Sequence, residues 1–403
     1  MQRYALRDDQ WKKIEDFLPG REGHVGGTAA DIGYVTAVQT VTRLVFVLVG
    51  GVWADRLRRH LVMLGSDVVR AAVQAGLAVL LISGHCLVWE LGLGACVFGA
   101  AQAFFGPACA GLVPQTVPAE HLRQGNALIG LAASFLEVAG PATAGLLVAA
   151  FGPGLVFAVD SATYVVSAVS LSLLRLSRQS MPERGSFRAD LAAGWREIAL
   201  RRWYWLSLIA HALWNFAIPA YLVLGPVIAA RMLGGASAWG VIAAAWAAGE
   251  AAGGIVALRA RPGRPLVAAN LALVLTALPL LALAWPLATW SIGVAAAVSG
   301  GGLAFLSVTW ATTTQQLIPG QVLSRVVSYD WLISLLAMPA GFAIVGPLAA
   351  EFGDPLVLVW ASVLLAVPAL MIALLPAVRG VRRTADGGVA GSERRDVGRA
   401  LAT

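Results

Sequence analysis

The chain is poor in charged residues and in cysteine, and each shortage excludes a class of protein. Charged residues make up 13% of the 403 residues and hydrophobic ones 58%, and the mean hydropathy is +0.75. A soluble domain cannot bury that much apolar surface, so a membrane must be part of the solvent. The three cysteines, Cys86, Cys96 and Cys109, provide neither a disulfide framework nor a CxxC metal pair. We expect them to pack in or beside apolar segments.

The chain also lacks the sequence motifs of nucleotide and active-site chemistry. It contains no Walker loop, no glycine-rich nucleotide fingerprint and no HExxH pair, and no Ser/His/Asp set has supporting context. Its opening has no basic region leading into an apolar core and a cleavage site, so we predict no signal peptide. These absences predict a protein that is not an enzyme, binds no metal or cofactor, and does not use ATP.

What the chain has instead is a series of apolar segments, most of them near the roughly twenty residues that cross a bilayer. This pattern predicts an all-α polytopic membrane protein in the cell (plasma) membrane. We expect eleven spans: 32–53, 61–82, 87–113, 126–150, 154–176, 203–230, 238–258, 265–284, 286–312, 326–350 and 354–376.

Arginines concentrate in alternate joints between these spans. One set of joints holds Arg56, Arg58 and Arg59 and the loop 177–202, whereas the other set is almost free of basic residues. Because basic loops stay in the cytoplasm, we place the arginine-rich joints and the C-terminus there. The net charge of +7 then reflects topology, and we expect no nucleic-acid partner.

The sequence repeats itself at an interval of about 200 residues. Phe151-Gly152 is echoed by Phe352-Gly353, and Gly140 and Gly145 are echoed by Gly341 and Gly346. Two parallel halves around a basic middle loop are typical of major facilitator transporters. We predict five segments: a soluble leader at 1–31, an N-terminal half at 32–176, a cytoplasmic loop at 177–202, a six-helix half at 203–376, and a disordered tail at 377–403.

One joint carries a specific signature. Gly51-Val-Trp-Ala-Asp55-Arg56-Leu-Arg58-Arg59 resembles the major facilitator motif G-x-L-A-D-R-x-G-R-R/K, with Arg58 in place of the usual glycine. Gly51 would let two helices approach closely, and Asp55 could accept from arginines and backbone donors of a neighbour. We predict that Gly51, Asp55, Arg56 and Arg59 form a gate that latches one conformation. The alternative is an ordinary basic loop.

Further phrases resemble one branch of that superfamily. FFGPACAGLVPQTVP (104–118), GPATAGLLVAAFGPGLVFAVDSAT (140–163) and LSRVVSYDWLIS (323–334) are similar to the transmembrane secretion effector group, which includes enterobactin exporters and relatives of macrolide efflux pumps. The resemblance covers residues 32–380. It implies export of a small molecule, driven by proton antiport. We expect an amphipathic substrate, drug-like or siderophore-like, moved by alternating access, and a monomeric protein.

The first 31 residues do not continue this pattern. Tyr4 to Pro19 resembles the start of DDE-class insertion-sequence transposases, and it is a short amphipathic segment that Pro19 ends. Projecting the repeat backwards places the first family helix here, so we expect that helix to be missing from the first half. A natural cytoplasmic leader is one alternative. An inactive, transposon-truncated remnant of an exporter is the alternative at the level of function.

Ionisable residues at membrane depth are costly and are therefore candidate functional residues. Arg43 and Glu137 could pair, and the acid could then exchange a proton for substrate; a purely structural ion pair is the alternative. Asp160 has Ser161 and Thr163 beside it and fits an architectural role. Glu250 stands mid-span, where it could bind a proton or a cation or simply face water.

Two other groups of residues could shape the interior. Gly140, Pro141 and Gly145 partly resemble the antiporter motif of the fifth family helix, in which small residues and a proline bend the helix at a domain contact. Trp214, Trp246 and Trp310 lie deep in their spans and could line a drug-binding wall, but ordinary helix packing explains them more simply.

Overall fold

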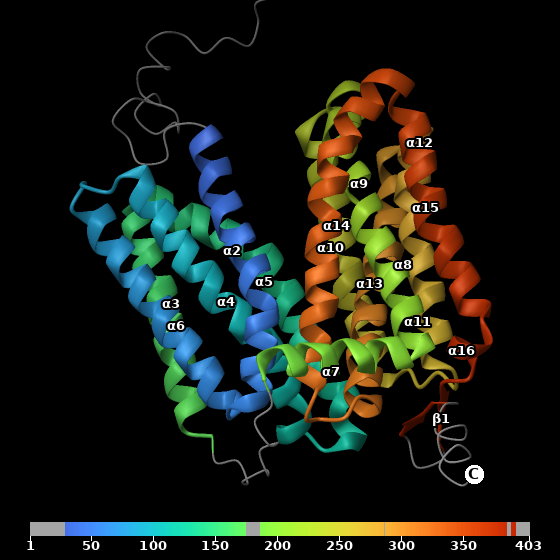
Figure 1. Cartoon of the computed structure of the whole chain (residues 1–403). Helices are drawn as coiled ribbons and strands as arrows, with labels where there is room; N and C mark the ends of the chain where they lie inside the picture. Colours follow the sequence, from blue (N-terminus) through green and yellow to red (C-terminus); the bar gives the residue numbers. More distant parts are fainter. Residues whose placement is uncertain (1–28, 175–185, 286, 385–387, 392–403) are drawn as a thin grey trace, which may run out of the picture. The chain divides into compact units, whose positions relative to one another are not determined.

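The computed structural model describes residues 29–174, 186–285, 287–384 and 388–391, apart from the side chains of 29–33, 137, 138, 141, 142, 145, 146, 149, 236 and 335. This part of the chain is almost entirely helical (Figure 1). The predicted soluble leader at 1–31 lies almost wholly outside the described residues.

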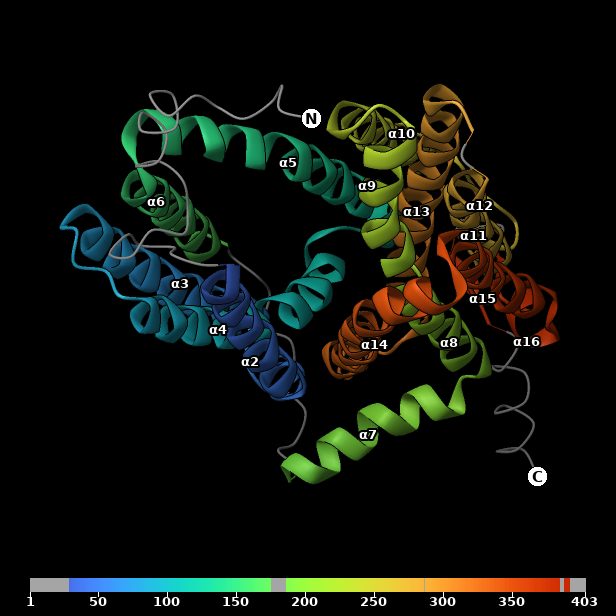
Figure 2. The same cartoon turned by 90° about the horizontal axis from the view of Figure 1, so that it is seen from above.

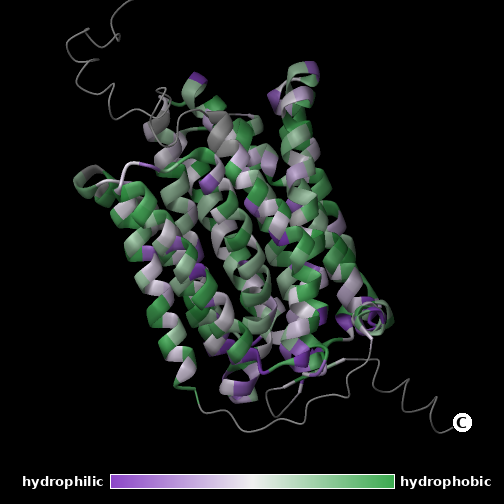
Figure 3. Ribbon diagram, turned by 60° about the vertical axis from the view of Figure 1, so that its left-hand side comes forward, coloured by the Kyte–Doolittle hydropathy of each residue, from purple (hydrophilic) through white to green (hydrophobic). Residues whose placement is uncertain are grey.

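Ten helical segments of the described residues are long and apolar enough to cross a membrane. They correspond to ten of the eleven predicted spans, and the remaining one, 126–150, falls within α5 (Leu122–Phe151). Along these helices most residues are apolar, and hydrophilic ones gather mainly toward the ends (Figure 3). The all-α fold predicted from the sequence is therefore confirmed.

The chain forms two compact units, and neither unit is one predicted half. The first consists of the described residues up to Phe46 with Leu61–Phe105 and Ala144–Leu174. It holds most of α3 (Arg59–Ile82) and α4 (Val88–Thr116), all of α6 (Pro153–Ser172), and the first part of α2 (Ala29–Arg56).

Backbone carbonyls and small residues join the helices of the first unit. The Ser66 hydroxyl on α3 donates to the Ala101 carbonyl on α4 (2.7 Å), and Ser161 on α6 donates to the Ala71 carbonyl on α3 (2.8 Å). Gly99 is so close to α2 that a Cβ there would lie 2.4 Å from the Gln39 oxygen. Cys86, Cys96 and Cys109 form no disulfide with one another.

The second unit consists of Val47–His60, Gly106–Thr143 and the described residues after Arg175. Its helices are α7 (Phe187–Leu200), α8 (Arg202–Ala217), α9 (Pro219–Met232), α10 (Ala236–Arg259), α11 (Pro265–Val274), α12 (Leu278–Ala284), α13 (Thr289–Leu317), α14 (Leu323–Phe352), α15 (Asp354–Leu374) and α16 (Pro376–Arg379), with short 3₁₀ turns η2 (Ala119–His121) and η3 (Leu275–Ala277). α7 runs crosswise to α8 and α14 (Figure 1).

Two predicted spans of this unit are interrupted helices. The span 203–230 is built from α8 and α9, which meet at Pro219, the first residue of α9. The span 265–284 is built from α11, η3 and α12. Proline lacks a backbone N–H and fits the first turn of a helix, so a new helix begins where the previous hydrogen-bond ladder stops.

Glycines set the closest helix pair of the second unit, α10 with α13. α13 packs against α10 on one side and α11 on the other (Figure 2). A Cβ on Gly249 would lie 1.9 Å from the Ala297 oxygen, and one on Gly253 would lie 2.2 Å from the Gly301 oxygen. Small residues allow such close approach, as they do in other membrane bundles.

Part of the segment that we predicted as a disordered tail is structured. After α16, strands β1 (Arg382–Arg383) and β2 (Val389–Ala390) pair antiparallel, with Arg383 opposite Val389. The backbone N–H of Arg383 donates to the Gly263 oxygen (2.9 Å), which holds this hairpin against the joint between α10 and α11.

Candidate functional site

The predicted gate motif ends α2, and Asp55 is its buried centre. The Asp55 side chain has no exposed surface. One carboxylate oxygen accepts from Arg59 Nη2 (2.7 Å) and the other from Arg325 Nε (3.1 Å). Both arginine side chains are also buried, at 6% exposure, so this is a desolvated ion-pair network, which is stable only when its hydrogen bonds are complete.

Backbone donors complete the coordination of Asp55. The N–H groups of Ser324 (3.3 Å) and Arg325 (3.0 Å), in the first turn of α14, donate to its carboxylate. A helix N-terminus carries free N–H groups and a partial positive charge, so it favours an anion. Asp55 on α2 therefore caps α14 across 269 residues of sequence.

Arg59 uses its remaining donors on three other elements. It donates through Nη1 to the Gly111 carbonyl on α4 (2.8 Å), through Nε to the Ser324 hydroxyl (3.2 Å), and to the Gly320 carbonyl. Its planar guanidinium has five N–H donors in a fixed fork, which suits a site that must satisfy several acceptors.

Arg325 links Asp55 to a second carboxylate on α7. Arg325 Nη1 pairs with Asp190 Oδ1 (2.9 Å), and Arg56 Nε pairs with Asp190 Oδ2 (2.7 Å). The Tyr329 hydroxyl donates to the Leu191 carbonyl (3.2 Å), which adds another contact between α14 and α7. We call Asp55, Arg56, Arg59, Asp190 and Arg325 the latch cluster.

Gly51 lies where the predicted close approach requires it. A Cβ at this position would lie 2.3 Å from Ser328 Oγ and 2.9 Å from the Ser324 oxygen, so a larger residue would push α2 away from α14. Asp190 and Arg325 were not predicted as site residues. Nothing local in the sequence connects Arg325 with a partner 270 positions away.

A second contact joins α5 to α13 in the same unit. Asn126 Nδ2 donates to Thr312 Oγ1 (3.1 Å) and to Gln315 Oε1 (2.7 Å), and Gln315 Nε2 donates to the Ala110 carbonyl (3.3 Å). Asn126 is buried. These bonds involve neutral groups, so they are weaker than the charged bonds of the latch cluster.

The first unit holds its own polar cluster, around Asp67 and Arg70. The two pair with each other, and the Ser167 hydroxyl donates to Asp67 Oδ2 (2.6 Å). The Arg70 guanidinium lies 4.3 Å from the Phe105 ring centre and 4.5 Å from that of Tyr164. Such cation–π contacts and the paired acid favour a structural role.

Asp160 is satisfied by a residue that the sequence did not indicate. Gln74 on α3 donates to its carboxylate. Ser161 instead bonds the Ala71 carbonyl, and the Thr163 hydroxyl bonds the backbone oxygen of Asp160. The Asp160 carboxylate is therefore hydrogen-bonded by Gln74 across α3 and α6, and not by Ser161 or Thr163 as expected. This supports the architectural interpretation of Asp160.

Several predicted residues of α2 and α5 remain predictions. The side chains of Glu137, Pro141 and Gly145 lie outside the described residues, so the proposed pairing of Glu137 with Arg43 is untested. Arg43 is half-buried on α2. A Cβ on Gly140 would have no described atom within 4 Å.

Each of the three deep tryptophans donates its indole N–H to a polar group. Trp214 donates to Thr276 Oγ1 (3.0 Å), Trp246 to Glu250 Oε1 (2.8 Å), and Trp310 to Asp330 Oδ2 (2.8 Å). Glu250 therefore pairs with a residue one turn away on its own helix. Asp330 was missed in the sequence, although the rule that selected Glu250, an acid inside a span, applies to it equally.

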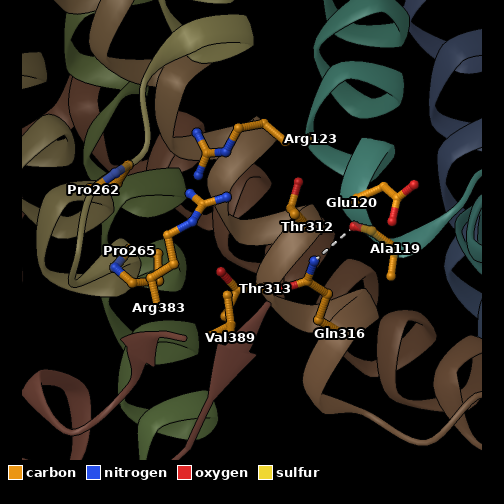
Figure 4. A pocket seen from close by; sticks show the side chains of 10 residues that line it. All are labelled: Ala119, Glu120, Arg123, Pro262, Pro265, Thr312, Thr313, Gln316, Arg383 and Val389. Carbon is orange, nitrogen blue, oxygen red and sulfur yellow. Dashed lines mark hydrogen bonds between the residues drawn. The ribbon is translucent and has the colours of Figure 1, made fainter. Parts of the chain in front are cut away.

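A small basic pocket lies between η2, α5, α13 and β1 (Figure 4). Arg123 and Arg383 bring their guanidinium groups toward one another there, Glu120 also lines the pocket, and the pocket volume is only about 10 Å³. Burial and the neighbouring charges of Arg383 and Arg261 lower the pKa of Arg123, in the first turn of α5, to about 10. The pocket therefore holds like charges in place at an energetic cost.

The membrane-length helices define a polytopic membrane protein. The chain belongs to the Major Facilitator Superfamily, whose family profile matches residues 17–341. That match begins within the segment that we assigned to the leader.

Its curated relatives are distant. Macrolide efflux protein A of Streptococcus pyogenes is 23% identical over 313 residues, which cover 75% of this chain and 76% of that protein. The Enterococcus faecalis protein of the same name is 23% identical over 72% of this chain and 92% of its own length. The uncharacterized MFS-type transporter y4rN of Sinorhizobium fredii is 29% identical over 60% of each chain.

Solved structures share the fold. A bacterial homologue of the iron transporter ferroportin, in an outward-facing state, superposes with a TM-score of 0.71 at 17% identity, over 86% of this chain and 90% of that one. The human organic anion transporter MFSD10 gives a TM-score of 0.68 at 19% identity, over 84% and 83%. These likenesses confirm the predicted major facilitator fold.

Proposed function

We propose that the protein exports a small amphipathic molecule, drug-like or siderophore-like, in exchange for protons. The latch cluster carries this proposal, because it joins elements of both predicted halves by bonds that can break and reform. The similarity to macrolide efflux proteins supports export, and the phrases shared with the transmembrane secretion effector branch support a small-molecule substrate.

In this proposal the latch cluster faces the cytoplasm, as does the C-terminus, and it closes one side of the transporter. While Asp55 caps α14 and Arg325 is held between two carboxylates, α2, α7 and α14 are tied together. Breaking these bonds would free the start of α14 and open that side. A transporter needs such a bistable contact, since alternating access requires two packings of similar free energy.

Proton coupling requires an acid that changes protonation during the cycle. We keep Glu137, with Arg43 as its partner, as one candidate for this role. The variant Glu137→Gln would then abolish pH-dependent efflux while leaving the amount of protein in the membrane unchanged. Wild-type pH dependence in this variant would exclude Glu137.

For residues 1–31 we keep the proposal that the segment derives from a transposase N-terminus. It rests on the sequence resemblance of Tyr4 to Pro19. A chimera that carries a family-type first helix in place of residues 1–31 provides the comparison. Efflux by the chimera alone would favour the alternative that this chain is an inactive remnant.

Accumulation of macrolides and cationic dyes in cells that express the chain tests the proposed export. We expect lower accumulation than in empty-vector cells, with the difference removed by a protonophore. Arg59→Gln should lose at least about tenfold of the efflux rate, since breaking a buried ion pair costs several kcal/mol. Arg58→Gln is the matched control, because Arg58 is adjacent but exposed. Equal efflux in both variants would contradict the role of the latch cluster.

A further inference from the structure

Asp330 is an acid inside a membrane-length helix. All of its described hydrogen-bond partners are neutral groups. It lies seven residues after Leu323, the start of α14, which is about 10 Å along the helix axis. Trp310 Nε1 on α13 donates to its Oδ2 at 2.8 Å, and the Ser334 side chain, one turn further along α14, bonds the same carboxyl group.

The groups packed around this contact come from α8 and α13. Tyr204 and His211 on α8 both rest on the Trp310 ring, with ring centres 4.9 Å and 4.8 Å from it. The Tyr204 hydroxyl is buried and has no hydrogen-bond partner among the described residues. Within the described chain, Asp330 forms no ion pair with any arginine, lysine or histidine.

Two buried acids among the described residues differ from Asp330 in having cationic partners. Asp55 has Arg59 and Arg325, and Asp67 has Arg70. A cation makes the charged form of those carboxylates favourable, so they are suited to remain ionised. Asp330 lacks this compensation, and a lone carboxylate at membrane depth is costly until it takes up a proton.

The partners of Asp330 can serve both protonation states. The indole N–H of Trp310 only donates, and it can remain on Oδ2 whether or not the other oxygen carries a proton. A serine hydroxyl can donate to the carboxylate or accept from the protonated acid. The site therefore needs little rearrangement when the proton arrives or leaves.

We propose that Asp330 is a proton-binding residue on the second predicted half of the transporter. It stands five residues after Arg325 on the same helix, so opening of the latch cluster would move it together with the start of α14. The role of Asp330 in driving transport rests on the proposed proton-coupled export. Reversible protonation of its side chain is independent of that proposal. The two parts can be tested separately.

Infrared difference spectra test protonation directly. The purified full-length chain in lipid nanodiscs is compared in mildly acidic and mildly alkaline buffer. We expect a carboxylic C=O band that is present in the wild type and in Glu250→Gln and absent in Asp330→Asn. Trp310→Phe should shift the frequency of that band, because a hydrogen bond to the carboxyl group is lost. An unchanged band in Asp330→Asn would overturn the proposal.

Transport by the same variants separates the two claims. We expect Asp330→Asn to lose proton-driven efflux at least about tenfold and to retain substrate counterflow, which needs no net proton movement. If the wild type transports nothing, the proposed export fails and the infrared result still decides on Asp330. If Asp330→Asn keeps wild-type proton-driven efflux, its role in coupling is wrong. Should Asp330→Asn fail to fold, two other variants decide whether the infrared band belongs to Asp330. Asp330→Glu should keep the band at a displaced frequency, and Trp310→Phe should shift it.

Discussion

Asp55 shows how one side chain can hold two distant parts of the chain. Its buried carboxylate accepts from two guanidinium groups and two backbone N–H groups. Four donors around one charge offset the cost of removing it from water, and loss of the charge would leave two arginines facing each other. Stability and, in the proposed function, gating at this residue therefore depend on the same bonds.

Replacing Asp55 by asparagine should destabilise the protein strongly. We expect a loss of about 3–5 kcal/mol, the usual cost of breaking a buried ion pair from one side. Asp354→Asn is the comparison, because the Asp354–Arg231 pair is exposed and long at 3.4 Å. That change should cost at most about 1 kcal/mol. Thermal unfolding in detergent measures both, and similar melting temperatures for the two variants would contradict a buried network.

In the basic pocket, by contrast, the charge of an arginine is predicted to destabilise the fold. Because the pKa of Arg123 is lowered to about 10, the folded state holds this proton less tightly than the unfolded chain does. Below that pH the charge destabilises the fold, and the cost diminishes as the pH rises from about 10 toward the higher pKa that arginine has in the unfolded chain. Burial and the charge of Arg261 lower the pKa of Arg383 as well.

Arg383→Gln should therefore raise the melting temperature at neutral pH, by about 1–2 °C. Arg379→Gln serves as the control, since Arg379 is exposed on α16, and it should leave the melting temperature unchanged. A clear decrease for Arg383→Gln would mean that this arginine has a stabilising role that outweighs the repulsion.

At the scale of residues, the sequence identified the members of the motif better than their distant partners. Asp55 and Arg59 stand in a recognisable motif, and their mutual bond spans four positions. Asp190 and Arg325 carry no motif, and only folding brings them to Arg56 and Asp55. Asp330 was missed for another reason: it was read as part of a branch phrase and not as an acid at membrane depth.

At the scale of elements, glycines in α10 and α13 decide how closely two helices approach. Gly249, Gly253 and Gly300 each leave no room for a methyl group against backbone of the facing helix. Gly240, which lies on α10 like Gly249 and Gly253, faces open space, with no described atom within 4 Å of a Cβ. One helix therefore supplies both a test position and its control.

Gly249→Ala should destabilise the protein by about 1–3 kcal/mol, because the new methyl group would overlap the Ala297 oxygen and force the helices apart. Gly240→Ala should instead stabilise it by up to about 1 kcal/mol, since alanine favours the helix. Chemical unfolding of the two variants decides. Equal effects would show that α10 and α13 do not depend on this contact.

Hydropathy predicted where the helices lie but not where they break. Runs of apolar residues indicated the spans at 203–230 and 265–284, yet each contains an interruption near a proline, at Pro219 and Pro279. A window average does not register a single missing N–H. The repeat of small residues between α10 and α13 was likewise invisible, since alanine and glycine occur throughout these helices.

At the scale of the whole molecule, the internal repeat and the motif at Gly51 predicted the superfamily, and the family match confirms it. The fold follows from these features because tandem halves and their linking joint leave few other architectures. Substrate and driving ion do not follow in the same way. We propose that they depend on a few side chains, such as those of Glu137 and Asp330, whose chemistry the common fold does not fix.

Proton-driven transport by the purified full-length chain in proteoliposomes tests the account most directly. A pH gradient is imposed across the liposome membrane, and movement of a labelled macrolide is followed with and without a protonophore. The account predicts substrate accumulation that requires the gradient, stops with the protonophore, and is lost in Arg59→Gln but kept in Arg58→Gln. Accumulation that ignores the gradient, or none in wild-type protein that is folded and inserted, would contradict it.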